Sequence, residues 1–176
     1  MPSVPQNVIP GHPSISFDSY TTSEAGPAIA RHFNSESSEA QAVGISTRMS
    51  TDGKVKSLVL LSLETAVVVQ IGSIRNLKSI YATFSQLASR HSKAIIGGFH
   101  MSRITLHVAR DFKIPIRGID LGTLLLPSTW EPLSPPQFIK EVGVDILNMR
   151  AFKDIWDCPL DEKDDQYAIL RAWMCS

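Results

Sequence analysis

The chain has 176 residues, a length typical of one domain, and Lys plus Arg and Asp plus Glu each number 17, so its formal net charge is zero. This balance argues against binding of DNA or an anionic membrane by the whole surface, although it permits a local basic patch. Hydrophobic residues make up 43% and charged residues 19% of the chain, which fits a globular core and excludes disorder throughout. The two cysteines, Cys158 and Cys175, are too few for a disulfide framework or a four-cysteine zinc site.

Signals for the membrane or for secretion are not predicted. No apolar run reaches the roughly 18 residues that cross a bilayer, and the first residues carry neither a positive leader nor an apolar stretch. We therefore expect an intracellular protein, nuclear or cytoplasmic, with reduced thiols and no membrane partner. Four prolines mark residues 1–14 as a flexible tail, and residues 15–176 form the expected domain. Because the last helix is expected to continue past Ser176, one interpretation is a domain truncated at its C-terminus.

The elements follow from periodicity and turn residues. A short strand is predicted at 15–17, a helix capped by Ser23 at 24–33, and a three-strand meander at 42–49, 55–63 and 66–71, with its first turn at Thr51-Asp52-Gly53. Then come a helix at 77–88, a strand at 94–96 ending in two glycines, helices at 103–112 and 137–142, a helix or strand-to-helix turn at 119–126, and a last helix at 161–174. This order predicts an α/β protein with a mixed sheet and helices on its faces.

The expected core consists of the apolar residues that these periods bring to one side: Val43, Ile45, Leu58, Leu60, Val68, Leu77, Phe84, Ile96, Val108, Leu121 and Ala168. Common catalytic motifs are missing from the sequence, including phosphate-binding glycine loops and the Gly-x-Ser-x-Gly elbow. His100 and His107 could share a helix face, but two histidines without a third ligand favour a polar face over a metal site. The acidic run at 161–165 favours a helix N-terminus over a metal site.

One C-terminal pattern is more specific. Trp156, Pro159-Leu160, Tyr167-Ala168 and Ala172-Trp173 follow one another without a gap. This stretch resembles the last motif of the RNase D and Werner-type 3′–5′ exonucleases, in which Trp and Pro-Leu precede a helix with Tyr-Ala-x-x-Asp-Ala and an aromatic residue. Upstream segments are similar to the family's earlier elements in the same order: Val43-Gly44-Ile45-Ser46-Thr47-Arg48, Gly53-Lys54-Val55 with the two strands that follow, Gly98-Phe99-His100, and Gly118-Ile119-Asp120-Leu121.

The resemblance covers roughly residues 15 to 174 and implies an RNase H-like fold, with a mixed central β-sheet flanked by helices. Such exonucleases hold two Mg²⁺ or Mn²⁺ ions on four carboxylates, and the ions activate water and stabilise the leaving oxygen. The matching positions here are Ser46, Arg48, Ile104 and Arg171, and a one-residue slip would replace Ile104 by Arg103. None is a carboxylate, so the resemblance implies no metal, no other cofactor and lost catalysis. Only Tyr167, matching the tyrosine that orients water, is kept.

Three functions remain open. A catalytically inactive pseudo-exonuclease would bind RNA or single-stranded DNA, with Arg48, Arg103 and Arg171 on phosphates and Tyr167 as a hydroxyl or stacking face. Against this, both Arg48 and Arg171 could pair with neighbours such as Asp164 and merely fill the old site. The second function is a protein-interaction or scaffold domain, with another protein or a second copy as partner, and the third, less favoured, is a divergent active exonuclease.

The register supplies a geometric expectation. Ser46 and Arg48 are two residues apart on a strand, so they share a face, and Tyr167 and Arg171 share a helix face at i, i+4. The resemblance implies that these four side chains meet at one site.

Overall fold

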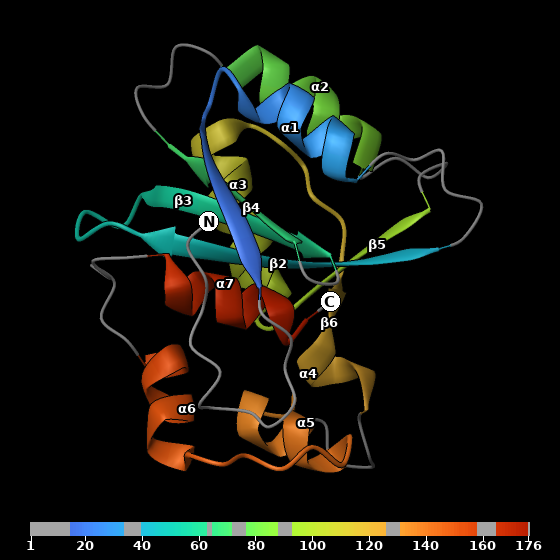
Figure 1. Ribbon diagram of the computed structural model, residues 1–176, viewed down its shortest axis with the longest axis vertical. Coiled ribbons are helices and arrows are strands. Elements are labelled where there is room, and N and C mark those ends of the chain that lie inside the picture. Colours follow the sequence, from blue (N-terminus) through green and yellow to red (C-terminus); the bar gives the residue numbers. More distant parts are fainter. Residues whose placement is uncertain are drawn as a thin grey trace.

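A mixed β-sheet forms the centre of the computed structural model, which describes residues 15–33, 40–62, 65–71, 77–87, 93–125, 131–157 and 165–175. Within these residues six strands follow the order β1-β4-β3-β2-β5-β6 (Figure 1). Their bounds are Ser16–Thr21 (β1), Gln41–Met49 (β2), Val55–Ser62 (β3), Thr65–Gln70 (β4), Ala94–Gly98 (β5) and Ile119–Asp120 (β6). Strands β2, β3 and β4 form the predicted antiparallel meander, while β1 runs parallel to β4, and β5 and β6 run parallel to β2.

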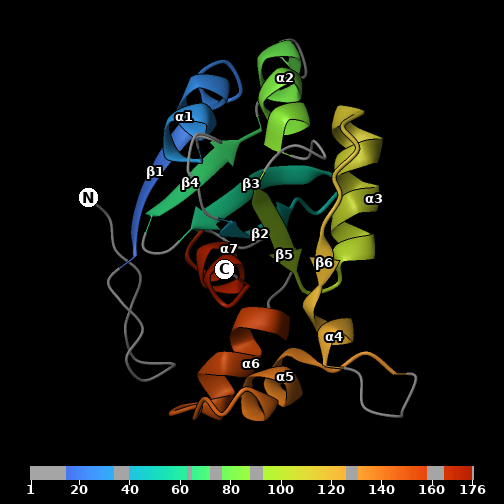
Figure 2. The same ribbon diagram turned by 90° about the vertical axis from the view of Figure 1, so that its right-hand side faces the viewer.

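Helices cover both faces of the sheet. Their bounds are Ala25–His32 (α1), Leu77–Leu87 (α2), Met101–Phe112 (α3), Leu121–Leu124 (α4), Pro135–Glu141 (α5), Met149–Asp157 (α6) and Gln166–Trp173 (α7). Figure 2 shows α1, α2 and α3 on one side of the sheet and α7 on the other, with α5 and α6 beyond α7. The α/β class and the mixed sheet with flanking helices are therefore confirmed.

The central strands bury apolar residues on both of their faces because helices cover both faces of the sheet. In β3, Leu58 and Leu60 enter the core under α1, α2 and α3, whereas Val59 and Leu61 enter the core under α7. Strand β4 alternates in the same way. Nine of the eleven expected core residues are buried; Leu121 is only partly buried, and the side chain of Leu77 lies outside the described part.

Several predicted boundaries need correction. The first strand extends to Thr21, and the N-cap of α1 is Glu24 instead of Ser23. The Glu24 carboxylate accepts hydrogen bonds from the amide and hydroxyl of Thr21, which ties the end of β1 to the start of α1. Helix α5 begins at Pro135, since Ser134 and Gln137 form a capping box. Helix α6 was not predicted at all. The last helix begins at Gln166, and the predicted positions 161–164 lie outside the described residues.

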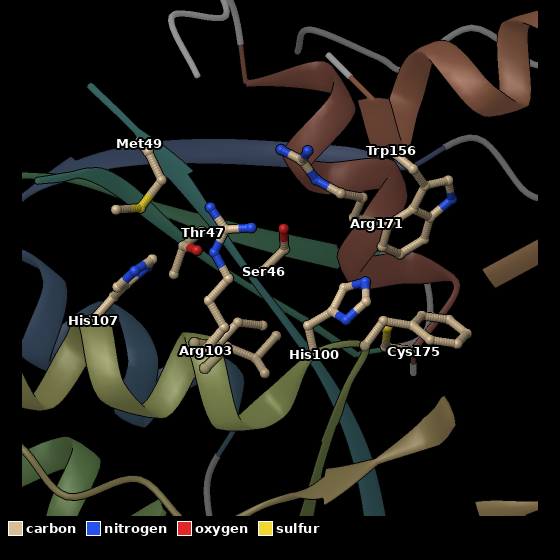
Figure 3. A pocket seen from close by; sticks show the side chains of 12 residues that line it. Ser46, Thr47, Met49, His100, Arg103, His107, Trp156, Arg171 and Cys175 are labelled. Carbon is tan, nitrogen blue, oxygen red and sulfur yellow. The ribbon is translucent and has the colours of Figure 1, made fainter. Parts of the chain in front are cut away.

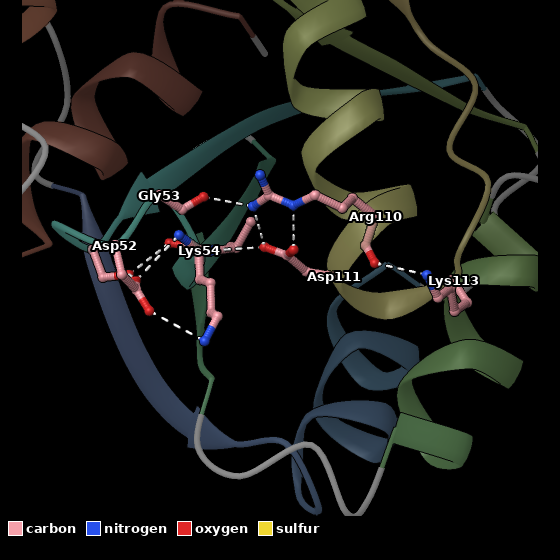
Figure 4. Close-up of polar contacts among 8 residues, drawn as sticks. Asp52, Gly53, Lys54, Arg110, Asp111 and Lys113 are labelled. Atoms are coloured by element: carbon pink, nitrogen blue, oxygen red, sulfur yellow. Dashed lines mark hydrogen bonds and ion pairs between the residues drawn. The ribbon is translucent and has the colours of Figure 1, made fainter.

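The hairpin between β2 and β3 is fastened to the C-terminal end of α3 (Figure 4). Its turn contains Gly53 at φ +75°, a left-handed conformation that favours glycine. Arg110 donates a hydrogen bond to the Gly53 carbonyl at 2.5 Å, and the amide of Val55 donates to Asp111 at 2.8 Å. These bonds fix the outer end of β2 against α3, and the candidate site lies between the same two elements. In the described part of the chain, no helix is long and apolar enough to span a membrane.

Candidate functional site

A cavity of about 160 Å³ lies where β2 runs beyond its neighbour β5. The two strands pair only from Gln41 to Gly44, and β5 then ends at Gly98, while β2 continues to Met49. Helix α3 closes one side of this gap, and α6 and α7 close the other (Figure 3). The described residues that line the cavity are Ile45, Ser46, Thr47, Met49, Phe99, His100, Arg103, Ile104, His107, Trp156, Arg171 and Cys175.

Helix α3 contributes a cationic side chain. Ile104 is buried in the core, which turns the preceding residue, Arg103, toward the cavity and solvent. In Figure 3 the Arg103 side chain crosses from α3 toward Ser46 and Thr47 on β2. Among the described residues its guanidinium makes no hydrogen bond and no ion pair, so it is available to a ligand.

Helix α7 contributes Arg171 from the opposite side of the cavity (Figure 3). The Arg171 Nη1 donates a hydrogen bond to the Ile155 carbonyl at 3.1 Å, which ties α7 to α6 and directs the guanidinium. Phe99 and Cys175, which also line the cavity, are both buried. Burial raises the pKa of the Cys175 thiol to about 12, so this thiol stays protonated at neutral pH.

Arg48 does not line the cavity. It is 6% exposed, and its Nη1 forms a salt bridge of 2.9 Å with Asp165, the residue that caps α7. The same carboxylate accepts hydrogen bonds from Ser57 on β3 at 2.6 Å and from Gln70 on β4 at 2.5 Å. Arg48, Ser57 and Gln70 are neighbours across the three strands. One buried carboxylate therefore fixes the start of α7 to the centre of the sheet.

The structure thus brings together only part of the predicted site. Ser46, Arg103, Ile104 and Arg171 line one cavity, whereas Arg48 and the 36%-exposed Tyr167 are not among its described lining residues. The expectation that Ser46, Arg48, Tyr167 and Arg171 meet at one site is therefore wrong for Arg48 and Tyr167, and Asp165 holds the Arg48 guanidinium. Pairing of Arg48 with a neighbour was one of the open alternatives; the partner is Asp165, and Asp164 lies outside the described residues.

Other lining residues had no predicted role in the site: Thr47, Met49, Trp156 and Cys175, together with His100 and His107, which had been considered only as metal ligands. His100 is recognisable in the structure by its left-handed conformation at φ 55°, directly before α3. A non-glycine residue at positive φ is uncommon and clusters at functional sites. The spacing of His100 and His107 was the only sequence signal that could have placed them together.

The cavity is electrostatically positive. Two arginines and two histidines line it, and none of the described lining residues is Asp or Glu. The pKa of His107 is lowered, first by burial and then by the positive charges of Arg103 and Arg110, with Asp111 acting in the opposite direction. An anion in this cavity would meet two guanidinium groups.

These side chains do not fit a magnesium or manganese pair. Hard divalent cations require several oxygen ligands, most of them carboxylates. Among the described lining residues the only side-chain oxygens are the hydroxyls of Ser46 and Thr47. More broadly, the described residues contain no cluster of three or more His, Cys, Asp or Glu side chains that could hold a metal ion.

Comparison with solved structures identifies the fold. Escherichia coli RNase D superposes with a TM-score of 0.60 at 15% identity, over 91% of this chain and 42% of that one. The Trypanosoma brucei RNase D complex with GMP gives 0.59 at 13% identity, over 89% and 54%, and the catalytic core of T. brucei RRP6 gives 0.55 at 13%, over 94% and 44%. The chain has the fold that these RNase D and RRP6 structures share, and it spans about half of their length.

At the level of sequence, no family model matches the chain, and no curated protein matches it either.

Proposed function

We propose that this chain is a catalytically inactive member of the 3′–5′ exonuclease fold that binds RNA or single-stranded DNA through the cavity between α3 and α7. The observation that carries the proposal is the chemistry of that cavity. Ser46, Ile104 and Arg171 line it, and these are positions at which the resemblance expects metal-binding carboxylates. Arg103, one residue from Ile104, adds a second guanidinium.

The residues account for binding without hydrolysis. Guanidinium groups bind phosphate oxygens through paired, charge-assisted hydrogen bonds, so Arg103 and Arg171 supply the positive charge that two metal ions supply elsewhere. A guanidinium cannot deprotonate water at neutral pH, because it has no free lone pair that could accept the proton. The scissile phosphate would therefore be held while no nucleophile is generated.

The remaining predicted residues have different parts in the proposal. Arg48 acts as a positioning residue, since its salt bridge with Asp165 holds the start of the helix that carries Arg171. Tyr167 lies on the same helix with 36% of its surface exposed, where its ring is available to stack on a base. The neutral net charge is compatible with a single basic cavity of this kind.

A solved structure with bound RNA supports the choice of ligand class. One structure of T. brucei RNase D is a complex with the RNA U12, and its TM-score against this chain is 0.57 at 12% identity. That complex concerns the trypanosomal protein; here it supports single-stranded RNA as the first ligand to test.

The test measures cleavage and binding on the same preparation. Labelled single-stranded RNA and DNA are incubated with the protein and Mg²⁺ or Mn²⁺, and binding is measured by anisotropy in EDTA at two salt concentrations. We expect no 3′ trimming, binding that survives EDTA, and an affinity that falls with salt because phosphate contacts release counterions. Metal-dependent trimming that is abolished in Tyr167→Phe would overturn the proposal, and so would the absence of binding to either nucleic acid.

A protein-interaction function is the second candidate, and one surface favours it. From the end of α5 to the first residue of α6, four apolar side chains are exposed within eight residues: Val142 (47%), Val144 (38%), Leu147 (64%) and Met149 (47%). Apolar side chains gathered in this way are typical of contact surfaces. If the chain is a dimer through this segment, Leu147→Ser will shift its mass in light scattering from two copies to one.

A further inference from the structure

We propose that Arg103 and His107 of α3 form a phosphate-binding pair on one side of the cavity, in which His107 contacts the phosphate as a charged imidazolium. This inference rests on the proposed function, and it adds a binding residue and a dependence on pH to the same site. Three observations carry it: the placement of the two side chains, their unused hydrogen-bonding capacity, and the charges around the histidine.

The two side chains lie on the same face of α3, because positions i and i+4 are neighbours on a helix. Both line the cavity, and in Figure 3 both lie on the side of α3 that faces Thr47 and Met49 of β2. Arg103 is exposed and His107 is partly exposed, so solvent reaches both. A phosphate that enters between α3 and β2 would therefore meet a guanidinium and an imidazole one helical turn apart.

The hydrogen-bonding capacity of this pair is unused. Among the described residues, neither the Arg103 guanidinium nor the His107 ring makes a hydrogen bond or an ion pair. The part of the chain that the structure describes also places no carboxylate in the lining of the cavity. Two positive groups at positions i and i+4 of a helix repel each other. A phosphate between them would replace this repulsion by attraction to both groups.

The surroundings of His107 keep its ring neutral in the free protein at neutral pH. The pKa of His107 lies below its usual value, first because the ring is partly buried and then because Arg103 and Arg110 are positive. Asp111 acts in the opposite direction, but its carboxylate is already engaged by Arg110 and by the Val55 amide. Strand β2 contributes no charged side chain to the cavity, and the other titratable residues among the described lining residues are His100, Arg171 and Cys175.

A bound phosphate reverses this preference for the neutral ring. Neutral imidazole has one N–H donor and one acceptor nitrogen, whereas imidazolium has two donors and a positive charge. The negative charge of a phosphate beside His107 favours the imidazolium, so the His107 pKa is higher in the complex than in the free protein. Binding therefore takes up a proton. The affinity rises as the pH falls through the pKa of the complex, and the gain ends below the pKa of the free protein.

The experiment measures RNA binding as a function of pH. The ligand is a single-stranded RNA of about ten nucleotides without a phosphomonoester at either end, because such a group would itself titrate near about pH 6. Anisotropy of a dye that does not titrate is recorded in EDTA, at constant ionic strength, between about pH 5.5 and about pH 8, a range in which ordinary carboxyl groups stay ionised. We expect the affinity to be about fivefold higher at the lower pH, a gain that one histidine proton can supply.

Variants connect the pH dependence to His107. His107→Gln keeps a polar side chain that cannot take up a proton, so its affinity should change by less than about twofold over the same range. His107→Lys carries a permanent charge and should bind at about pH 8 nearly as tightly as the wild type binds at about pH 5.5. His32→Gln is the matched control and should keep the wild-type profile, because His32 belongs to α1 and does not line the cavity. Thermal melting verifies that all three variants are folded.

Nuclear magnetic resonance supplies a readout that a purely structural role would not move. The imidazole signal that is missing from the spectrum of His107→Gln identifies His107 in the wild type. This signal is followed through a pH titration in the free protein and in the protein saturated with RNA. We expect the titration midpoint to be higher in the complex, because the phosphate stabilises the charged ring. A midpoint that RNA leaves unchanged would contradict the contact.

The remaining outcomes separate this inference from the proposed function. RNA binding with the same affinity at every pH would overturn the inference and leave nucleic-acid binding intact. A pH dependence that persists in His107→Gln and disappears in His100→Gln would assign the proton to the other histidine of the cavity and overturn the role of His107. RNA binding that is detected only at the acidic end of the range supports the inference. The absence of RNA binding at every pH would overturn the proposed function and this inference with it.

Discussion

Two arginines, Arg48 of β2 near the start of α7 and Arg171 near its end, lie in different surroundings, although the resemblance places both at lost acidic positions. Near the start of the helix, Arg48 is 6% exposed and shares the Asp165 carboxylate with Ser57 and Gln70. Near its end, Arg171 faces a cavity with a second arginine and no carboxylate among the described lining residues. The same kind of substitution has therefore become part of the packing at one end and a candidate anion site at the other.

This difference follows from what surrounds each guanidinium. A buried charge is costly unless a partner of opposite charge satisfies it, and Asp165 lies at 2.9 Å from Arg48. On the other side of the cavity from Arg171, Arg103 is exposed and keeps contact with water, so its charge requires no partner in the free protein. Arginine at a former metal position is therefore not evidence of phosphate binding by itself. Whether such an arginine can bind phosphate depends on how deeply it is buried and on whether a carboxylate already pairs with it.

The largest expected effect comes from breaking the buried pair. Asp165→Ala leaves Arg48 as an unpaired charge in a site where both side chains are at most 10% exposed, so we expect a loss of about 3–5 kcal/mol in the free energy of unfolding. Urea denaturation measures it. The double variant Arg48→Met, Asp165→Leu should recover part of the loss, since an apolar pair needs no compensation. A loss below about 1 kcal/mol, the value of an exposed pair, would contradict this account of the α7 start.

The second prediction places a carboxylate in the cavity. In Ser46→Asp the new side chain lies between Arg103 and Arg171 and competes with phosphate for both, so we expect about a tenfold loss of affinity for single-stranded RNA. Ser46→Asn is the matched control, because it has nearly the same shape without the charge. Neither variant should degrade RNA in Mn²⁺, since one carboxylate does not make a two-metal site. Unchanged affinity in Ser46→Asp would place the bound phosphate elsewhere.

Much of the fold could be predicted because its signals are local. In β2, β3 and β4 short β-branched runs alternate with turn residues, and α3 repeats its apolar residues at the helical period. The type and the approximate bounds of these elements could therefore be predicted from the sequence. Helix α6 was missed although Phe152, Ile155 and Trp156 have the spacing of a buried face and Asn148 accepts a hydrogen bond from the Ala151 amide at its start. Only nine residues long, it gave too few periods to stand out from a loop.

The site was less predictable, because it depends on directions that sequence spacing leaves open. The i, i+4 relation puts Tyr167 and Arg171 on one helical face, one turn apart, but only the position of α7 along the sheet decides which of them reaches the cavity. The partner of Arg48 shows the same limit. Asp164 and Asp165 are adjacent in the sequence, and neighbouring positions at the start of a helix point about 100° apart, so spacing could not choose between them.

The smallest expected effect concerns the hairpin fastened to α3 (Figure 4), which is polar like the α7 start but includes an exposed partner, Arg110. The hydrogen bond from Arg110, followed by the one from the Val55 amide, lowers the pKa of Asp111 below its usual value. A carboxyl with a depressed folded-state pKa stabilises the protein above its unfolded pKa of about 3.9 and loses that contribution as the pH falls through the folded value.

Asp111→Asn should cost about 1 kcal/mol near neutral pH, and its difference from the wild type should shrink below about pH 4. Urea midpoints of the wild type and the variant at several pH values measure this difference. The pH-dependent contributions of the other carboxyl groups cancel, because both proteins carry the same groups. A difference that stays constant from pH 6 to pH 3 would mean that the hairpin is held by its turn and not by the ionised Asp111, which would leave the α7 start as the more important polar anchor of β2.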